Sequence, residues 1–177
     1  SREVGLRHYD LGNDLYRAML DKRLNYTCAY WKNAKTLDQA QEAKLDLICK
    51  KMKLIPGMHI LDIGCGWGSL AKYVAEKYQV KVTGITVSRE QVRLANEICQ
   101  DLDVDIRYQD YRDIKEEFDA VVSVGMFEHV GYKNYREFFR VVYRCLKDEG
   151  LFLLHTIGSN LPVKVPNPWI NKYIFPN

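Results

Sequence analysis

The stretch HILDIGCGWGSL, residues 59–70, places a glycine-rich turn directly after a short apolar run. Residues 59–63 have the length and composition of a buried strand, and apolar residues at helical spacing follow from residue 69. Glycines between a strand and a helix allow a sharp bend and let the backbone approach a ligand closely. The stretch therefore predicts the first strand and helix of an α/β sheet, with a ligand at the turn.

The alternation of strands and helices continues along the chain. Four further segments have a strand pattern: QVKVTGI (79–85), VDIRY (104–108), FDAVVSV (118–124) and GLFLLHTI (150–157). Helical stretches at 69–78, 88–101 and 134–146 separate them. This alternation predicts a parallel sheet with crossover helices. Because ligands of such sheets bind beyond the carboxyl ends of the strands, site residues are expected just after each strand.

The segments before and after the sheet have other patterns. Residues 10–20 and 36–52 carry apolar residues at helical spacing, and Thr36 and Gln39 are placed as a capping box. We expect both helices to lie outside the sheet. Residues 158–177 carry four of the five prolines and show no helical or strand period, which predicts at most a covering loop. The domain therefore looks unfinished at its carboxyl end.

Composition sets the general class. With 177 residues, 47% hydrophobic and 28% charged, the chain is expected to form one soluble globular domain. No apolar run reaches the roughly 18 residues that a membrane span requires. The chain starts Ser-Arg-Glu, without an initiator Met or a signal-peptide core, so we expect a cut inside a longer protein.

Cysteine and lysine placement bears on compartment and partners. The five cysteines include no C-x-x-C pair, which argues against a zinc site and a disulfide framework and suits a reducing cytosol. The net charge is +3, with Lys50, Lys51 and Lys53 close together. A solvated helix face explains this cluster, and attraction to an anionic membrane surface is the alternative.

The spacing of the glycine turn narrows the choice of ligand. Asp62, Gly64, Gly66 and Gly68 form an acidic residue followed by G-x-G-x-G, the form usual in S-adenosylmethionine-dependent methyltransferases. Domains that bind NAD or FAD also use a glycine-rich turn, usually with G-x-G-x-x-G. A purely structural tight turn is the remaining alternative.

The turns after the next two strands offer further ligand contacts. After the second strand stand Thr86 and Gln91, so a ribose contact there would use neutral groups. Ser88 and Gln91 also fit a capping box, which is the structural alternative. After the third strand, Asp110 is placed to accept from an adenine amino group and Tyr111 to flank the ring, unless this is a solvated loop.

Three more segments converge on the same edge of the predicted sheet. In VVSVGMFEHVG (121–131), Glu128 and His129 follow the fourth strand, and His155 ends the fifth. Far upstream, YTCAYW (26–31) is too aromatic for plain surface. Each residue alone has a structural explanation, but their convergence favours a site.

Together, the motifs of this chain resemble those of cyclopropane-fatty-acyl-phospholipid synthases and the related mycolic acid cyclopropane synthases. The similar motifs are HYDLGNDLY, YTCAYW, LDIGCGWGSLA, QDYRD, VGMFEHVG, LLHTIG and PWINKYIFPN, spread over essentially the whole chain. The resemblance implies a Rossmann-like class I S-adenosylmethionine-dependent methyltransferase fold with N-terminal helices, truncated at the C-terminus. Residues 1–55 would form a helical cover of the active site, and residues 56–177 an incomplete methyltransferase core. The family's last strands, one tyrosine of its active-site shell and the N-terminal domain of bacterial synthases would lie outside this chain.

The resemblance also implies a reaction. The double bond of an unsaturated acyl chain in a membrane phospholipid attacks the methyl group of S-adenosylmethionine, and loss of a proton from the added methyl closes a cyclopropane ring. By this resemblance the base would be a bicarbonate ion, held here by Glu128, His155 and the backbone N–H groups of Cys28 and Ile157. The carboxylate accepts the bicarbonate hydroxyl proton while the other groups donate to its oxygens. His129 has no such role and is interpreted as structural.

The cofactor contacts implied by the resemblance are more numerous. They are Tyr26, Thr27, Asp62, Gly64, Cys65, Gly66, Trp67, Gly68, Thr86, Gln91, Asp110 and Tyr111. A carbocation also requires a dry site with aromatic faces, for which the candidates are Tyr26, Tyr30, Trp31, Trp67 and Phe127. No metal is expected.

The resemblance places the protein in the cytoplasm, in peripheral contact with the inner face of a membrane, without nucleic acid. A homo-oligomer is left open. Two rival functions also stay open at this point: a methyltransferase acting on a small molecule, and a non-catalytic module that binds lipid or cofactor. A nicotinamide oxidoreductase is less favoured, because it would want an acidic residue where Thr86 stands.

Overall fold

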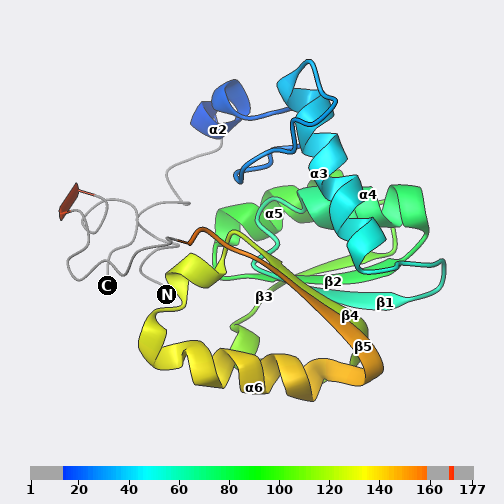
Figure 1. Cartoon of the computed structure of the whole chain (residues 1–177), viewed down its shortest axis with the longest axis vertical. Helices are drawn as coiled ribbons and strands as arrows, with labels where there is room; N and C mark the ends of the chain where they lie inside the picture. The colour runs from blue at the N-terminus through cyan, green and yellow to red at the C-terminus, as the bar shows by residue number, and fades with distance from the viewer. Residues whose placement is uncertain (1–13, 159–167, 170–177) are drawn as a thin grey trace.

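A single parallel sheet organises the part of the protein that the computed structural model describes, residues 14–158 and 168–169 (Figure 1). Its strands are β1 (His59–Ile63), β2 (Lys81–Thr86), β3 (Val104–Tyr108), β4 (Phe118–Val124) and β5 (Leu146–His155). They lie in the order β3-β2-β1-β4-β5, and each neighbouring pair is parallel. The predicted parallel α/β fold is thus confirmed. The strand order reverses between β1 and β4, so a crevice is expected beyond their carboxyl ends.

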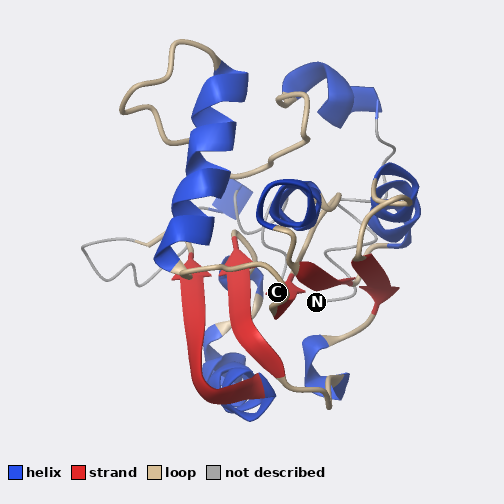
Figure 2. Cartoon of the chain, turned by 90° about the vertical axis from the view of Figure 1, so that its right-hand side faces the viewer, coloured by secondary structure: helices blue, strands red, loops and turns tan. Residues whose placement is uncertain are grey.

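Helices cover both faces of the sheet (Figures 1 and 2). The α-helices are α2 (Asp14–Met19), α3 (Leu37–Lys51), α4 (Ser69–Tyr78), α5 (Arg89–Ile98) and α6 (Tyr135–Cys145), and the short 3-10 turns are η2 (Tyr111–Asp113), η3 (Phe127–His129) and η4 (Tyr132–Asn134). Figure 1 shows α3, α4 and α5 on one face and α6 on the other. In the described residues, no helix is long and apolar enough to cross a bilayer.

Each face of the sheet buries its own apolar cluster. On β1, Ile60 packs with residues of α3 and α4, whereas Leu61 and Ile63 pack with Phe138 and its neighbours on α6. Successive strand residues point to opposite faces. A strand covered on both sides is therefore apolar almost throughout, which is the pattern that made HILDI readable as a buried strand.

The start of α3 shows how closely the local sequence signals hold. The Thr36 hydroxyl accepts a hydrogen bond from the Gln39 N–H at 3.3 Å, as a capping box requires. The reciprocal bond differs, because the Gln39 side chain accepts from the Lys35 N–H at 2.9 Å rather than from Thr36. Both bonds satisfy backbone N–H groups at the amino end of the helix.

Two strand boundaries differ from the prediction for a backbone reason. Strand β2 begins at Lys81, because Gln79 has a φ of 54° and ends α4 in the left-handed region. Strand β5 begins at Leu146, before the predicted residue 150, and its pairing with β4 is irregular between Phe118 and Ala120. Residues 147–149 lack the apolar pattern from which strands are predicted. The predicted helix over 10–20 is seen from Asp14 to Met19, and its earlier positions lie outside the described residues, as does most of the predicted loop over 158–177.

Candidate active site

A cavity of about 730 Å³ lies at the crevice where the strand order reverses. Its walls come from the turns that follow the strands and from the segment before α3: residues 24–27, 62–67, 85–88, 109–112 and 124–126, with Lys44, Gln91 and His129 among the others. The cavity therefore lies where the topology predicts a ligand. It has the size of a small-molecule site.

The three glycines of the turn after β1 have different surroundings. All have positive φ, but a Cβ on Gly64 would lie 2.5 Å from the Met126 Cγ, and a Cβ on Gly68 would lie 3.2 Å from the Ala95 Cβ. A Cβ on Gly66 would meet no atom within 4 Å, and Gly66 lines the cavity. Gly64 and Gly68 thus allow close packing within the protein. Gly66 leaves room on the cavity side.

Asp62 brings a buried carboxyl group to the cavity. It is 2% exposed near the carboxyl end of β1, and burial raises its pKa to about 7, against the opposing effect of the Lys44 charge. Lys44 on α3 is 6% exposed, and burial lowers its pKa to about 8. A carboxyl group that ionises near neutral pH can accept a hydrogen bond from a ligand ammonium or hydroxyl group.

The neutral polar residues at the end of β2 and just after it form a small network with each other. Thr86 Oγ1 donates to Gln91 Oε1 at 2.7 Å, and the Ser88 hydroxyl accepts from the Gln91 N–H at 3.3 Å. The helix cap at Ser88 is therefore present, and all three residues also line the cavity. The structural and the ligand-binding interpretations of this turn involve the same residues.

The carboxylate of Asp110, in the turn after β3, already has hydrogen-bond partners within the protein. Asp110 accepts the Arg112 backbone N–H at 3.0 Å and pairs with the Arg112 guanidinium at 2.6 Å. This pairing holds the pKa of Asp110 below its usual value. Tyr111 packs edge-on against Phe138, with ring centroids 5.4 Å apart. Both Asp110 and Tyr111 line the cavity, and their predicted contacts with an adenine ring stay a prediction.

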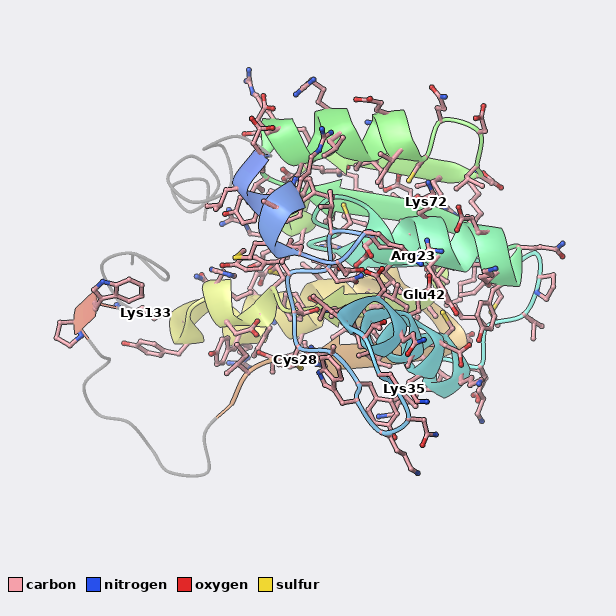
Figure 3. The ribbon with its side chains drawn as sticks, turned by 90° about the horizontal axis from the view of Figure 1, so that it is seen from above. Arg23, Cys28, Lys35, Glu42, Lys72 and Lys133 are labelled. Atoms are coloured by element: carbon pink, nitrogen blue, oxygen red, sulfur yellow. The ribbon has the colours of Figure 1, made fainter. Side chains whose placement is uncertain are left out.

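The four residues predicted to hold bicarbonate come together as two contacting pairs. Cys28 Sγ lies 3.4 Å from His155 Nε2, and Glu128 Oε1 accepts the Ile157 N–H at 2.8 Å (Cys28 is labelled in Figure 3). Among the residues that the structure describes, the buried atoms Glu128 Oε2 and His155 Nδ1 have no hydrogen-bond partner. Buried polar atoms in native proteins nearly always have a partner, so these two atoms are candidates to bind a polar ligand.

Gly125 joins these pairs to the cavity. Its N–H donates to the His155 carbonyl at 2.9 Å, and a Cβ at this position would lie 2.3 Å from the Thr27 methyl carbon. Thr27 and Gly125 both line the cavity, while Cys28 follows Thr27 directly. The two halves of the predicted site are therefore neighbours in space.

Comparison with known proteins identifies the family. A family model described as mycolic acid cyclopropane synthetase matches residues 1–177. The chain belongs to this family. It is 61% identical over 174 residues to the cyclopropane-fatty-acyl-phospholipid synthase of Escherichia coli K12, covering 98% of this chain and 46% of the relative. The chain thus spans about half the length of the curated relatives it matches.

Two solved structures of cyclopropane synthases share the architecture. The cyclopropane synthase MmaA2 from Mycobacterium tuberculosis has a TM-score of 0.90 and 34% identity, over 99% of this chain and 68% of the other. The mycolic acid cyclopropane synthase CmaA1, complexed with SAH and CTAB, has a TM-score of 0.83 and 37% identity, over 86% of this chain and 55% of the other. These matches confirm the methyltransferase fold inferred from the motifs.

Within this member of the cyclopropane synthetase family, the predicted aromatic residues occupy different places. Tyr26 and Trp67 line the cavity, and Trp67 is buried against Tyr16. Phe127 is a core residue that stacks on Tyr135, with ring centroids 4.3 Å apart. The other two candidates, Tyr30 and Trp31, are exposed, as is Tyr26, but unlike Tyr26 they are not among the residues that line the cavity.

Some cavity residues of this synthetase-family chain were missed from the sequence. They are Asn25, Lys44, Gln109, Arg112 and Asn134, and His129, interpreted as structural, also lines the cavity. Lys44 did carry a signal, because it interrupts the apolar stripe of α3 between Ala40 and Ile48. The described residues contain no group of three His, Cys, Asp or Glu able to hold a metal ion.

Proposed function

We propose that the protein transfers a methylene group from S-adenosylmethionine to the double bond of an unsaturated acyl chain of a phospholipid, forming a cyclopropane ring. One observation carries the proposal. A cavity with an open glycine wall at Gly66 adjoins a polar cluster with orphaned atoms on Glu128 and His155, in a chain of the cyclopropane synthetase family.

The cavity fits S-adenosylmethionine in size and in chemistry. Its volume of about 730 Å³ accommodates a ligand of this class, and Gly66 offers a wall without a side chain. Asp62 presents a carboxyl group to a ligand ammonium or hydroxyl, and Thr86 and Gln91 present neutral oxygens to a ribose. When bound, S-adenosylmethionine would supply the electrophilic methyl group. The protein's contribution is to orient that methyl toward the acyl chain and to exclude water.

The polar cluster fits a small anion that carries both a donor and acceptors. Within the described part of the chain, Glu128 Oε2 is an acceptor without a donor, and His155 has an unpartnered ring nitrogen able to donate. The Ile157 amide donates to Glu128 Oε1 and so orients this carboxylate, while Cys28 contacts His155 through its Sγ. We assign bicarbonate to this cluster, where it would supply the base that removes a proton. Glu128 would raise the basicity of such an anion by accepting its hydroxyl proton.

The remaining parts of the proposal concern the surroundings of the site. We propose that residues 1–55, of which 1–13 lie outside the described residues, cover the cavity, because Tyr26, Thr27 and Lys44 from this part line it. The proposed reaction requires the protein to reach the acyl chain of a membrane lipid. We therefore propose that the protein is cytoplasmic and makes peripheral contact with the inner face of the membrane. Trp31 and Ile157 are exposed apolar residues, 53% and 77%, and suit that contact.

A lipid assay tests the proposal and separates its rivals. The protein is incubated with S-adenosylmethionine labelled in the methyl group and with vesicles of unsaturated phospholipid, and the acyl chains are then examined by mass spectrometry and proton NMR. Ring protons at the former double bond support the proposal, and vesicles of saturated phospholipid serve as the control. Label in a methyl branch would make the protein a methyltransferase of another kind. Cofactor binding without turnover would make it a non-catalytic module.

A further inference from the structure

The segment that forms one wall of the cavity has little regular structure of its own. Residues 20–36 contain neither a helix nor a strand, and their backbone hydrogen bonds to other elements include Tyr30 N–H to the Ala40 carbonyl at 3.0 Å. Side chains therefore hold much of this segment in place. Residues 25–27 nevertheless line the cavity, and Cys28 reaches His155.

A buried lysine lies behind this wall. Lys44 Nζ donates to Asn25 Oδ1 at 3.1 Å and to Thr27 Oγ1 at 2.7 Å. One turn earlier on α3, Gln41 Nε2 donates to the Thr27 carbonyl at 2.8 Å. Thr27 is thus bound by α3 at both its side chain and its backbone.

The other side of Thr27 packs against the sheet. Its methyl group occupies the space that a Cβ on Gly125 would need, so the two residues are in close contact just after β4. Thr27 is therefore clamped between Lys44 on one side and Gly125 on the other. Any shift of Thr27 must also move its neighbours, Tyr26 in the cavity wall and Cys28 beside His155.

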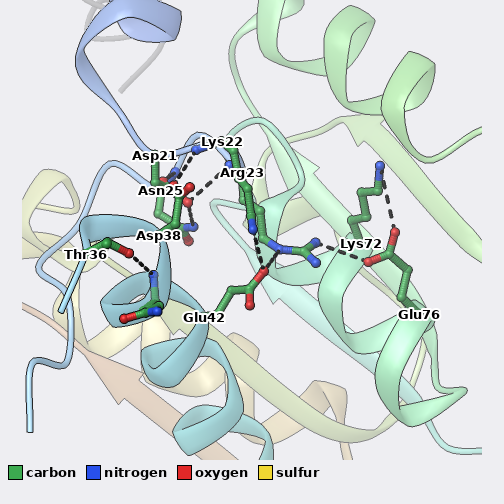
Figure 4. Close-up of polar contacts among 10 residues, drawn as sticks. Asp21, Lys22, Arg23, Asn25, Thr36, Asp38, Glu42, Lys72 and Glu76 are labelled. Atoms are coloured by element: carbon green, nitrogen blue, oxygen red, sulfur yellow. Dashed lines mark hydrogen bonds and ion pairs between the residues drawn. The ribbon is translucent and has the colours of Figure 1, made fainter. Parts of the chain in front are cut away.

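Asn25, the second partner of Lys44, is fixed from a different direction. The Asp21 carboxylate accepts the Asn25 backbone N–H at 2.7 Å and its side-chain amide at 3.0 Å (Figure 4). The backbone N–H and the side-chain amide of Asn25 both donate to Asp21. This orients the side-chain oxygen of Asn25, Oδ1, to accept from Lys44. The chain Asp21–Asn25–Lys44–Thr27 is buried or partly buried throughout.

These contacts lead to a role for a residue that the proposed reaction does not use directly. We propose that Lys44 is a positioning residue that seats residues 25–28 against Gly125, and so sets both the cavity wall and the Cys28 amide. This rests on the proposed function only in naming S-adenosylmethionine and bicarbonate as the ligands of those two places. An ammonium suits the task, because one group donates to two oxygens at charge-assisted strength.

The surroundings of Lys44 act on its charge in opposite directions. Burial disfavours the charge and lowers the pKa of Lys44 to about 8, while the carboxylates of Asp21 and Asp62 attract the ammonium group and limit this shift. The side chain therefore stays protonated near neutral pH. A neutral replacement of similar shape removes both hydrogen bonds without opening a cavity.

Hydrogen exchange tests, without any ligand, whether Lys44 holds residues 25–28 in place. The comparison uses Lys44→Met and, as the matched control on the same helix, Lys51→Met, whose lysine is exposed. In Lys44→Met, amides of residues 22–30 should exchange at least about tenfold faster, while amides of β1 keep their rates. Lys51→Met should exchange like the wild type. Unchanged exchange over residues 22–30 overturns the proposal, and so does an equal acceleration in β1, which would show a general loss of stability.

A double-mutant cycle tests the effect on the site. Thr27→Val keeps the methyl contact with Gly125 but removes the hydroxyl that accepts from Lys44. Calorimetry should show that Lys44→Met and Thr27→Val each weaken S-adenosylmethionine binding at least about fivefold, and that the double variant is no weaker than the weaker single variant. Effects that multiply would show independent roles and overturn the positioning role. A wild type that binds no S-adenosylmethionine refutes the proposed function instead, and the exchange experiment still decides the role of Lys44.

Discussion

A methyl group on Gly66 gives a direct test of where the cofactor lies. Gly66 has a φ of 57°, and its Cβ would meet no protein atom within 4 Å, so Gly66→Ala creates no clash inside the protein. The cost to folding is then limited to backbone strain, about 1 kcal/mol for an L-residue in the left-handed region. For a protein of this size that lowers the melting temperature by about 2–4 °C. The new methyl instead occupies the cavity, where the ligand must approach the backbone.

Gly57 provides a matched control for the strain. It also has a positive φ, 88°, and open space where a Cβ would lie, but it precedes β1 at the opposite end of that strand from the cavity. Gly57→Ala should lower the melting temperature by a similar amount and leave S-adenosylmethionine affinity unchanged by calorimetry. Gly66→Ala should weaken binding at least about tenfold, or 1.4 kcal/mol, and Gly66→Val should abolish it. Wild-type affinity in Gly66→Ala would refute the placement of the cofactor against this glycine.

Three further predictions concern ionisable side chains. Glu128→Gln keeps the shape of the side chain but loses a charge-assisted acceptor. Single-turnover ring formation should therefore slow by about one to two powers of ten, while the affinity for S-adenosylmethionine stays the same. A parallel loss of affinity would place Glu128 in the cofactor site instead. Burial raises the pKa of Asp62 from 3.8 to about 7, so the folded protein binds the Asp62 proton more tightly than the unfolded chain does. The stability that this protonation contributes is therefore lost as the pH rises from 3.8 to about 7. Melting temperatures measured from about pH 4 to pH 8 should therefore fall more steeply in the wild type than in Asp62→Asn, and parallel curves would contradict the raised pKa. Of the five thiols, Cys28 alone is exposed, and burial raises the pKa of the other four. A thiol reagent at about pH 8 should therefore react rapidly with one thiol, and Cys28→Ser should remove this fast reaction. A fast reaction that persists in Cys28→Ser would contradict this burial pattern.

The sheet could be predicted from the sequence because its signals are local. The strand over 59–63, the glycine turn and the helix over 69–78 agree with the observed β1 and α4, since apolar runs and turn glycines need no knowledge of distant contacts. The start of β5 could not be predicted in the same way. Residues 147–149 lie between the pairs Phe118–Leu146 and Ala120–Leu151, where the register with β4 shifts, and such an irregularity depends on the partner strand.

Some site residues could likewise be predicted from local sequence, and others could not. Residues at the carboxyl ends of strands, such as Asp62 and Thr86, could be named because parallel topology brings those ends to one edge of the sheet. Lys44 could not be assigned a role, because its partners Asn25 and Thr27 lie in a segment without secondary structure. The Lys44 interruption of an apolar helix face indicated a buried polar partner, but only the folded arrangement identifies which one.

Gly125 shows why the cofactor cavity and the anion cluster should act as one site. Its φ of 67° and its contact with the Thr27 methyl leave no room for a side chain, while its N–H binds the carbonyl of His155. The cavity wall at Thr27 and the cluster at His155 thus meet on a single backbone unit. A proton acceptor must lie within hydrogen-bond reach of the methyl group that it deprotonates. In the proposed reaction, the turn at Gly125 would therefore set the positions of the methyl donor and of the base together, and residues that hold Thr27 in place would influence both.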